Sequence, residues 1–152
     1  MDVNGFDCSD MVASYIGTAL WSSSCWLPCM ADELVDGCMN VDEEHPLHGI
    51  SEGDRLDAHF DTSDCTDEML SKAIKDCEAF KGKCEGAGLW ERMLELHTEE
   101  QIGHDFWLTL NGHGAGFWES EWEEIGDQVT SLVRNHFSEL DIWIDENGKL
   151  SF

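Results

Sequence analysis

The sequence LDIWIDENGKLSF at residues 140–152 decides the fold that we expect for this chain. Asn-Gly at positions 147 and 148 is a strong signal for a two-residue turn between two strands. We therefore expect short strands at 140–145 and 149–152, joined as an antiparallel hairpin.

The residues before this hairpin predict a strand, a loop and a helix. Residues 106–110 have the pattern of a strand, and the glycine-rich loop 111–116 follows them. Residues 119–137 predict a helix, because apolar side chains such as Trp122, Ile125 and Val129 recur on one side. Strands are thus expected mainly in the last third of the chain.

The first two thirds of the chain predict helices. Residues 9–22 form an amphipathic pattern that Ser9 can cap, and residues 66–84 and 89–96 form two more. Thr98, with Gln101 three residues later, resembles a capping box for one further turn. Residues 23–64 show no sustained periodicity, and we expect short helices or an irregular acidic flap there.

Together these patterns predict an α+β fold, with several helices packed on a small antiparallel sheet formed mainly by the C-terminal third. The 152 residues suit a single domain, 1–152. Its first part, 1–100, is expected to be helical and strongly acidic, and its second part, 101–152, to contain the strands.

Charge is the most unusual property of the sequence. Against 33 acidic residues there are 8 basic ones, for a formal net charge of −25. Direct binding of nucleic acid or of an anionic membrane surface takes lysine and arginine, so both are excluded as simple electrostatic partners. Because 41% of the residues are hydrophobic, the chain nevertheless has enough apolar side chains for a core.

The sequence predicts a protein of the cytosol. It shows neither a secretory signal nor an apolar stretch of membrane-spanning length. Its seven cysteines are an odd number and suggest reduced thiols rather than a disulfide framework. Cys25, Cys29 and Cys38 form a weak zinc pattern, and buried or idle thiols are the simpler interpretation.

The densest chemical segment is GHDFWLTLNGHGAGFW at residues 103–118. Its loop motif comprises His104, Asp105, Asn111, Gly112, His113, Gly114 and Gly116. His104, Asp105 and His113 can be metal ligands or an acid/base set if they converge, or they can shape the loop through local hydrogen bonds. We favour the local role, and we expect no catalytic residue, no metal and no cofactor.

This segment resembles a family of small, acidic, uncharacterised proteins of tailed bacteriophages. The family motif is similar to DFWLTRNGHGAGFWD, and residues 105–118 reproduce it with Leu110 in place of the arginine and Glu119 in place of the last aspartate. The similarity extends to YIGTALWS at 15–22 and to the closing strand and turn. It implies a phage product that acts in a bacterial cytosol, and little about mechanism.

These observations predict a phage-encoded inhibitor that mimics DNA and blocks the basic cleft of a host nuclease or CRISPR effector. Carboxylates would stand where the target expects phosphates. The expected phosphate surrogates are Asp32, Glu33, Asp36, Asp42, Glu43, Glu44, Glu52, Asp54, Asp57, Asp61, Asp64, Asp67 and Glu68, then Glu119, Glu121, Glu123, Glu124 and Asp127.

Two other interpretations stay open. One is a small enzyme or metal-binding module that uses the His104, Asp105 and His113 loop. The other is adaptation to high salt, which also produces acidic surfaces but does not require seven cysteines and seven tryptophans. The sequence leaves the oligomeric state and the identity of the target open.

Overall fold

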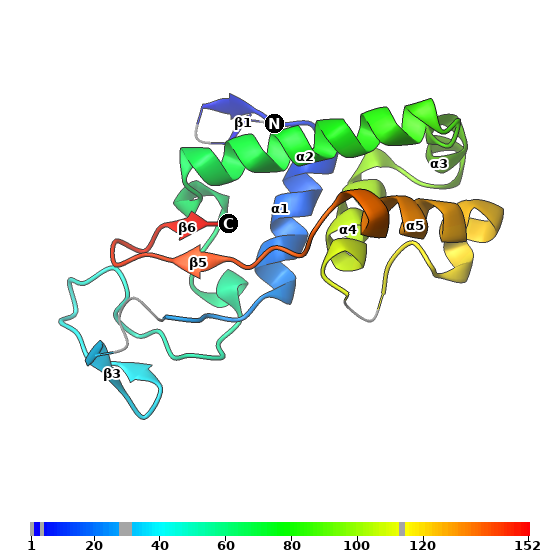
Figure 1. Ribbon diagram of the computed structural model, residues 1–152. Coiled ribbons are helices and arrows are strands. Elements are labelled where there is room, and N and C mark those ends of the chain that lie inside the picture. Colours follow the sequence, from blue (N-terminus) through cyan, green and yellow to red (C-terminus); the bar gives the residue numbers. More distant parts are fainter. Residues whose placement is uncertain (1, 4, 28–31, 113–114) are drawn as a thin grey trace.

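Helices dominate the computed structural model, which describes residues 2–3, 5–27, 32–112 and 115–152 (Figure 1). The α-helices of these residues are α1 (Asp10–Ser22), α2 (Asp67–Gly86), α3 (Trp90–Leu96), α4 (Glu99–Leu110) and α5 (Gly126–His136). The connections between them include the short 3₁₀ helices η2 (Leu56–Ala58), η3 (Thr62–Asp64) and η4 (Ser120–Ile125). The strands are β1 (Asp2–Val3), β2 (Phe6–Asp7), β3 (Leu34–Val35), β4 (Cys38–Met39), β5 (Trp143–Ile144) and β6 (Leu150–Ser151).

Three helices begin with a side-chain cap, predicted at Ser9 and Thr98 and found also at Thr66. The side chains of Ser9, Thr66 and Thr98 accept hydrogen bonds from the backbone N–H three residues further on. Each bond satisfies one of the N–H groups that a helix start leaves unpaired. The predicted helices 9–22, 66–84 and 89–96 are therefore confirmed, with ends shifted by at most two residues.

The strand predicted at 106–110 is wrong, because these residues complete α4. The helix that Thr98 caps runs for 12 residues rather than one turn. All five side chains from Phe106 to Leu110 are buried, so the segment shows no polar face by which a helix is recognised. A short apolar run of this kind fits a buried strand as well as a buried helix.

The helix predicted at 119–137 is divided in two. Residues Ser120–Ile125 form η4, and only Gly126–His136 form the α-helix α5. The break lies at Glu123, whose φ of 51° is outside the right-handed helical region. The apolar stripe continues through both parts, since Trp122, Ile125 and Val129 are all buried.

The α+β class is confirmed, but a single sheet formed mainly by the C-terminal third is not. Among the described residues the strands make three separate antiparallel pairs, β1 with β2, β3 with β4 and β5 with β6. The last pair is the predicted hairpin in shortened form. Its register joins Ile144 to Leu150, so a longer connection than Asn147-Gly148 lies between the strands.

The core forms where α1 crosses α4 beneath α2 (Figure 1). Tyr15 on α1 packs against Phe106 and Trp107 on α4, with ring centroids 5.1 and 5.3 Å apart. Phe80 on α2 stacks on Phe106 at 4.2 Å. Gly103 permits the crossing, because a Cβ there would lie far inside contact distance of the Met11 carbonyl oxygen.

Candidate acidic interaction surface

The predicted phosphate surrogates all lie at the surface. Each is exposed or half-buried, and the half-buried ones are Asp54, Asp64 and Glu119. A carboxylate at the surface keeps its hydration and is available to a cationic partner. The exposure that an electrostatic mimic requires is therefore present throughout the predicted set.

The larger acidic group, at 32–68, is partly fixed by local hydrogen bonds. His59 Nε2 lies 2.7 Å from one oxygen of Asp54, and the Ser51 backbone N–H donates to the same oxygen at 3.0 Å. The hydrogen bond from His59 is the main reason that the pKa of Asp54 lies below its usual value. This carboxylate is thus held both ionised and in place.

A second fixed point in this group is the start of η3. Asp61 accepts from the backbone N–H and the hydroxyl of Ser63, and Asp64 accepts from the Asp61 backbone N–H, which makes a reciprocal capping box. The side-chain hydrogen bond with Ser63 is the largest cause of the lowered pKa of Asp61. Both carboxylates are therefore held by the backbone turn itself.

Three consecutive members of the group have no such restraint, although Asp57 is paired with Arg55 at 2.6 Å. The side chains of Asp42, Glu43 and Glu44 are exposed and make no hydrogen bond or ion pair within the described residues. They precede Pro46 in a turn next to the β3–β4 hairpin. This part of the group presents uncompensated negative charge to the solvent.

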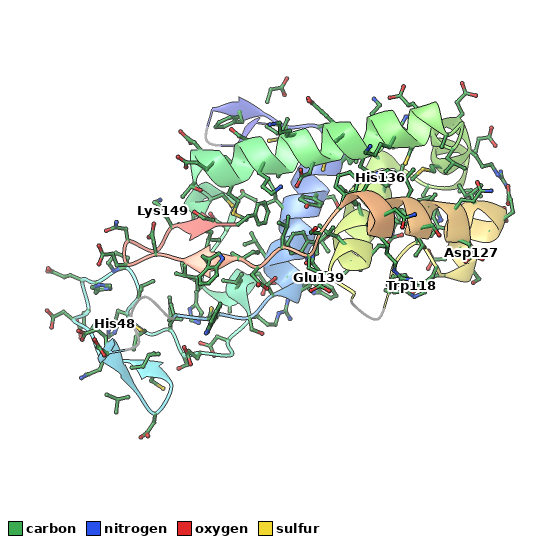
Figure 2. The ribbon with its side chains drawn as sticks, viewed as in Figure 1. His48, Trp118, Asp127, His136, Glu139 and Lys149 are labelled. Atoms are coloured by element: carbon green, nitrogen blue, oxygen red, sulfur yellow. The ribbon has the colours of Figure 1, made fainter. Side chains whose placement is uncertain are left out.

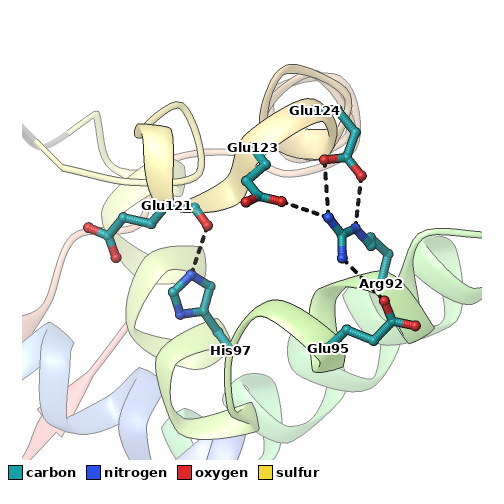
Figure 3. A network of polar contacts seen from close by, with 6 residues as sticks. All are labelled: Arg92, Glu95, His97, Glu121, Glu123 and Glu124. Atoms are coloured by element: carbon teal, nitrogen blue, oxygen red, sulfur yellow. Dashed lines mark hydrogen bonds and ion pairs between the residues drawn. The ribbon is translucent and has the colours of Figure 1, made fainter.

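The smaller acidic group, at 119–127, is organised by one arginine (Figure 3). Arg92 on α3 reaches across to η4, where its guanidinium donates to Glu123 at 2.6 Å and to Glu124 at 2.8 Å. It also contacts Glu95 at 3.2 Å on its own helix. These bonds lower the pKa of Glu124 and raise that of Arg92.

Carboxylates also act on one another in this group. The side-chain hydrogen bond with Glu121 is the largest cause of the raised pKa of Glu119, followed by burial and then by the charge of Glu121. On the other side of Glu121, His97 Nε2 contacts its backbone carbonyl oxygen at 3.0 Å (Figure 3). Negative charge is thus concentrated here even though Arg92 neutralises part of it.

The larger group extends from one end of the molecule to its middle, where η2 packs against α1, and the smaller group lies at the other end (Figure 1). Figure 2 labels His48, within the larger group's segment, at one end and Asp127 at the other. The aromatic core of α1, α2 and α4 lies between these two labelled residues (Figure 1). A single flat array of all the predicted acids is therefore not formed, and each end is a separate acidic face.

The loop motif does not assemble an acid/base or metal set among the described residues. His104 Nδ1 contacts Thr18 Oγ1 on α1 at 3.0 Å, whereas Asp105 is buried and accepts from Trp122 Nε1 at 2.7 Å and from Gln101 at 3.1 Å. The two neighbours have different partners because they lie on different sides of α4. His113 and Gly114 lie outside the described residues.

The other residues of the motif hold the loop against the fold. Phe117 N–H donates to Thr109 Oγ1 at 2.9 Å, and Leu140 N–H donates to Asn111 Oδ1 at 2.9 Å. Gly112 has a positive φ of 67°, and a Cβ at Gly116 would collide with Thr109 and the Trp118 ring. The local hydrogen-bonding role that we favoured does not hold for His104, because its partner Thr18 lies on α1, 86 positions away in the sequence. For His113 it stays a prediction.

Of the six cysteines in the described residues, five are buried. Burial raises the pKa of Cys25 to about 11 and that of Cys65 to about 12. Cys38 is exposed, and Cys29 of the weak zinc pattern lies outside the described residues. Within the part of the chain that is described, no three His, Cys, Asp or Glu side chains gather as a metal site.

Two surface features were not predicted. Trp26 and Trp143 are 47% and 45% exposed, and their rings pack together with centroids 4.8 Å apart. A groove also runs between α1 and α4 past His104. Neither has a local sequence signal, because each joins residues more than 80 positions apart.

No protein-family model, curated protein or solved structure matches this chain. None of the helices in the described ranges has both the length and the apolar character needed to cross a membrane.

Proposed function

We propose that this protein is a phage-encoded inhibitor that mimics DNA and occupies the basic nucleic-acid-binding cleft of a host defence protein, of the anti-restriction or anti-CRISPR type. The observation that carries the proposal is the exposure of the predicted acids on a chain of net charge −25. Duplex DNA presents about one charge per 1.7 Å of its axis, and a basic cleft is attracted to any surface of similar charge density.

Carboxylates that are fixed in position support mimicry of DNA rather than a diffuse negative charge. Asp54, Asp61 and Asp64 are held by hydrogen bonds, and Glu123 and Glu124 by Arg92. A charge held in place loses less conformational freedom on binding than one on a mobile side chain. The larger group, with few cations near it, is the better candidate for the contact face.

The exposed pair Trp26 and Trp143 supports a protein partner. Glu139 and Asp141 line the same shallow pocket as Trp26, so an arginine of a basic partner would meet both an aromatic face and negative charge there. Tryptophan is among the residues that most often dominate protein interfaces. The acids would then steer the encounter, and the tryptophans would slow dissociation.

The test is inhibition of DNA binding by purified bacterial nucleases and CRISPR effectors. Fluorescence anisotropy of a labelled duplex is measured with increasing amounts of this protein, from low to high salt. We expect inhibition that weakens steeply as salt rises. Inhibition that is indifferent to salt would contradict the proposal.

Variants locate the contact face. The triple variant Asp42→Asn, Glu43→Gln, Glu44→Gln should weaken inhibition roughly threefold to tenfold, because each exposed ion pair contributes only modestly. The matched control Glu78→Gln, Glu85→Gln, Glu91→Gln removes the same charge from exposed positions on α2, its C-terminal turn and α3. Equal losses in both variants would show that net charge alone acts. If His104→Ala lost the inhibition of DNA binding while both triple variants kept it, the result would favour the enzyme interpretation instead.

A further inference from the structure

The groove between α1 and α4 has the features of a binding site for an extended organic cation. Its volume is about 600 Å³, within the range of small-molecule sites. It is lined by Asp10, Ala13, Ser14, Gly17, Thr18 and Trp21 from α1 and by Glu100 and His104 from α4. These residues belong to neither acidic group of the proposed inhibitor surface.

The α1 lining residues form a single stripe. Asp10, Ser14, Gly17 and Trp21 recur at spacings of three and four, which places them on one face of a helix. At 1.5 Å per residue, the stripe is about 16 Å long. A ligand that contacts its whole length must therefore be extended.

One end of the groove is negative. Asp10 and Glu100, from the first turns of α1 and α4, both line it, and neither carboxylate is paired with a described residue. Two carboxylates from different helices fit an ammonium or guanidinium group, which donates several hydrogen bonds.

The other end of the groove is aromatic. Trp21 is 51% exposed, and its ring centroid lies 6.1 Å from that of His104. The bond between Thr18 and His104 Nδ1 fixes the imidazole in position. An indole face that is open to solvent attracts a second cationic group through its π-electrons.

Small residues line the groove between the two ends. Ala13 and Gly17 lie there, and a Cβ at Gly17 would meet no atom within 4 Å. The open space leaves room for methylene groups, which have no hydrogen bonds to satisfy. A chain of methylenes with a cation at each end matches this order of carboxylates, small residues and indole.

We propose that the groove binds a linear aliphatic polyamine, with one ammonium group at Asp10 and Glu100 and another over Trp21. The protein alone suffices to test this, so failure here would leave the inhibitor proposal intact. The probe is spermidine, with n-butylamine and Mg²⁺ as controls for length and for charge. The readouts are calorimetry and the indole N–H resonance of Trp21, assigned from the spectrum of Trp21→Phe.

We expect spermidine to bind one to one and to shift the Trp21 resonance, and n-butylamine and Mg²⁺ to bind at least tenfold more weakly. Gly17→Leu fills the groove without changing charge and should weaken spermidine binding at least tenfold. It should leave inhibition of DNA binding unchanged. Trp21→Ala, at an exposed site, gives the same test by calorimetry if Gly17→Leu is poorly folded.

A charge-matched pair completes the experiment. Asp10→Asn with Glu100→Gln should weaken spermidine binding at least tenfold, whereas Glu43→Gln with Glu44→Gln should change it less than twofold. Equal losses in these two double variants would show diffuse attraction to an acidic protein and would overturn the proposal. Undiminished binding by both Gly17→Leu and Trp21→Ala would overturn it for the same reason. Absence of spermidine binding would overturn it as well.

Discussion

Asp105 is buried on α4, the only carboxylate in the described ranges with so little exposure. Trp122 and Gln101 both donate to it. Asp105→Ala should lower the free energy of unfolding by about 1–3 kcal/mol, because the indole N–H would lose its buried acceptor. Asp105→Asn keeps an acceptor for Trp122 and should therefore be more stable than Asp105→Ala. Chemical denaturation of both variants checks this, and equal losses would contradict the hydrogen-bond argument.

The charge of Asp105 also gives stability a definite dependence on pH. Burial raises the pKa of this carboxyl, and the hydrogen bonds from Trp122 and Gln101 only partly oppose that effect. The folded state therefore holds the proton more tightly than the unfolded chain, so this group's contribution falls as pH rises through the folded pKa. Asp105→Asn should reduce that fall. Denaturation of parent and variant across the acid range measures the difference, and parallel curves would contradict the assignment.

Two glycines in helix interiors should respond oppositely to alanine. At Gly103 a Cβ would collide with the Met11 backbone, so Gly103→Ala should destabilise the protein by about 1–3 kcal/mol or more. At Gly17 the space is open, and Gly17→Ala should stabilise it by about 0.5–1 kcal/mol. Thermal unfolding of the two variants distinguishes the effect of close packing between helices, at Gly103, from the effect of helix propensity, at Gly17. Similar destabilisation by both would show that α1 and α4 do not meet as described.

Local chemistry made some elements predictable and left others hidden. Caps at Ser9 and Thr98 identified two helix starts, because a side chain that bonds the backbone three residues on acts within one turn. The strand expected at 106–110 failed because a fully buried helix has no polar face. The β3–β4 turn was missed, although Asp36 and Gly37 have the positive φ values that an Asp-Gly hairpin turn requires.

The candidate site shows the same division. Exposure of the acids followed from composition, since charged side chains are rarely buried. Three other features depend on which helices pack together. They are the separation of the two acidic groups, the contacts of Arg92 and the α1–α4 groove. Local pattern does not encode such long-range pairings, and they became visible only with the fold.

The contact between α3 and η4 depends on Arg92, which bonds Glu123 and Glu124. Because the two carboxylates that Arg92 contacts are exposed, these ion pairs should contribute little to the free energy of unfolding of the whole protein. Arg92→Gln should instead speed amide hydrogen exchange in η4, since Glu123 holds a strained backbone with φ of 51°. Lys83→Gln, which removes an equal charge from an exposed site on α2, is the control. Equal exchange rates in η4 for both variants would contradict the role of Arg92.

The molecule carries its charge unevenly, with four lysines on α2 and most of the acids outside that helix. Salt screens repulsion within each acidic group and so should favour the folded state. The rings of Tyr15, Phe80 and Phe106 pack on one another through apolar contacts, which carry no charge for salt to screen. We therefore expect the core to fold in dilute buffer despite the repulsion between carboxylates, without the molar salt that a salt-adapted protein needs.

Neutralising acids should therefore have opposite effects according to their contacts. Glu43→Gln with Glu44→Gln removes unpaired charge and should raise Tm by a few degrees in dilute buffer, with a smaller gain in high salt. Asp54→Asn should lower Tm at neutral pH instead, because the ionised carboxylate is held by His59 and the Ser51 N–H. That contribution of Asp54 is present above the unfolded pKa and is lost as pH falls through its lowered folded pKa.

Calorimetric scans of both variants and the parent in low and high salt make the comparison. A parent chain that folds only in molar salt would instead favour salt adaptation as the reason for its acidity.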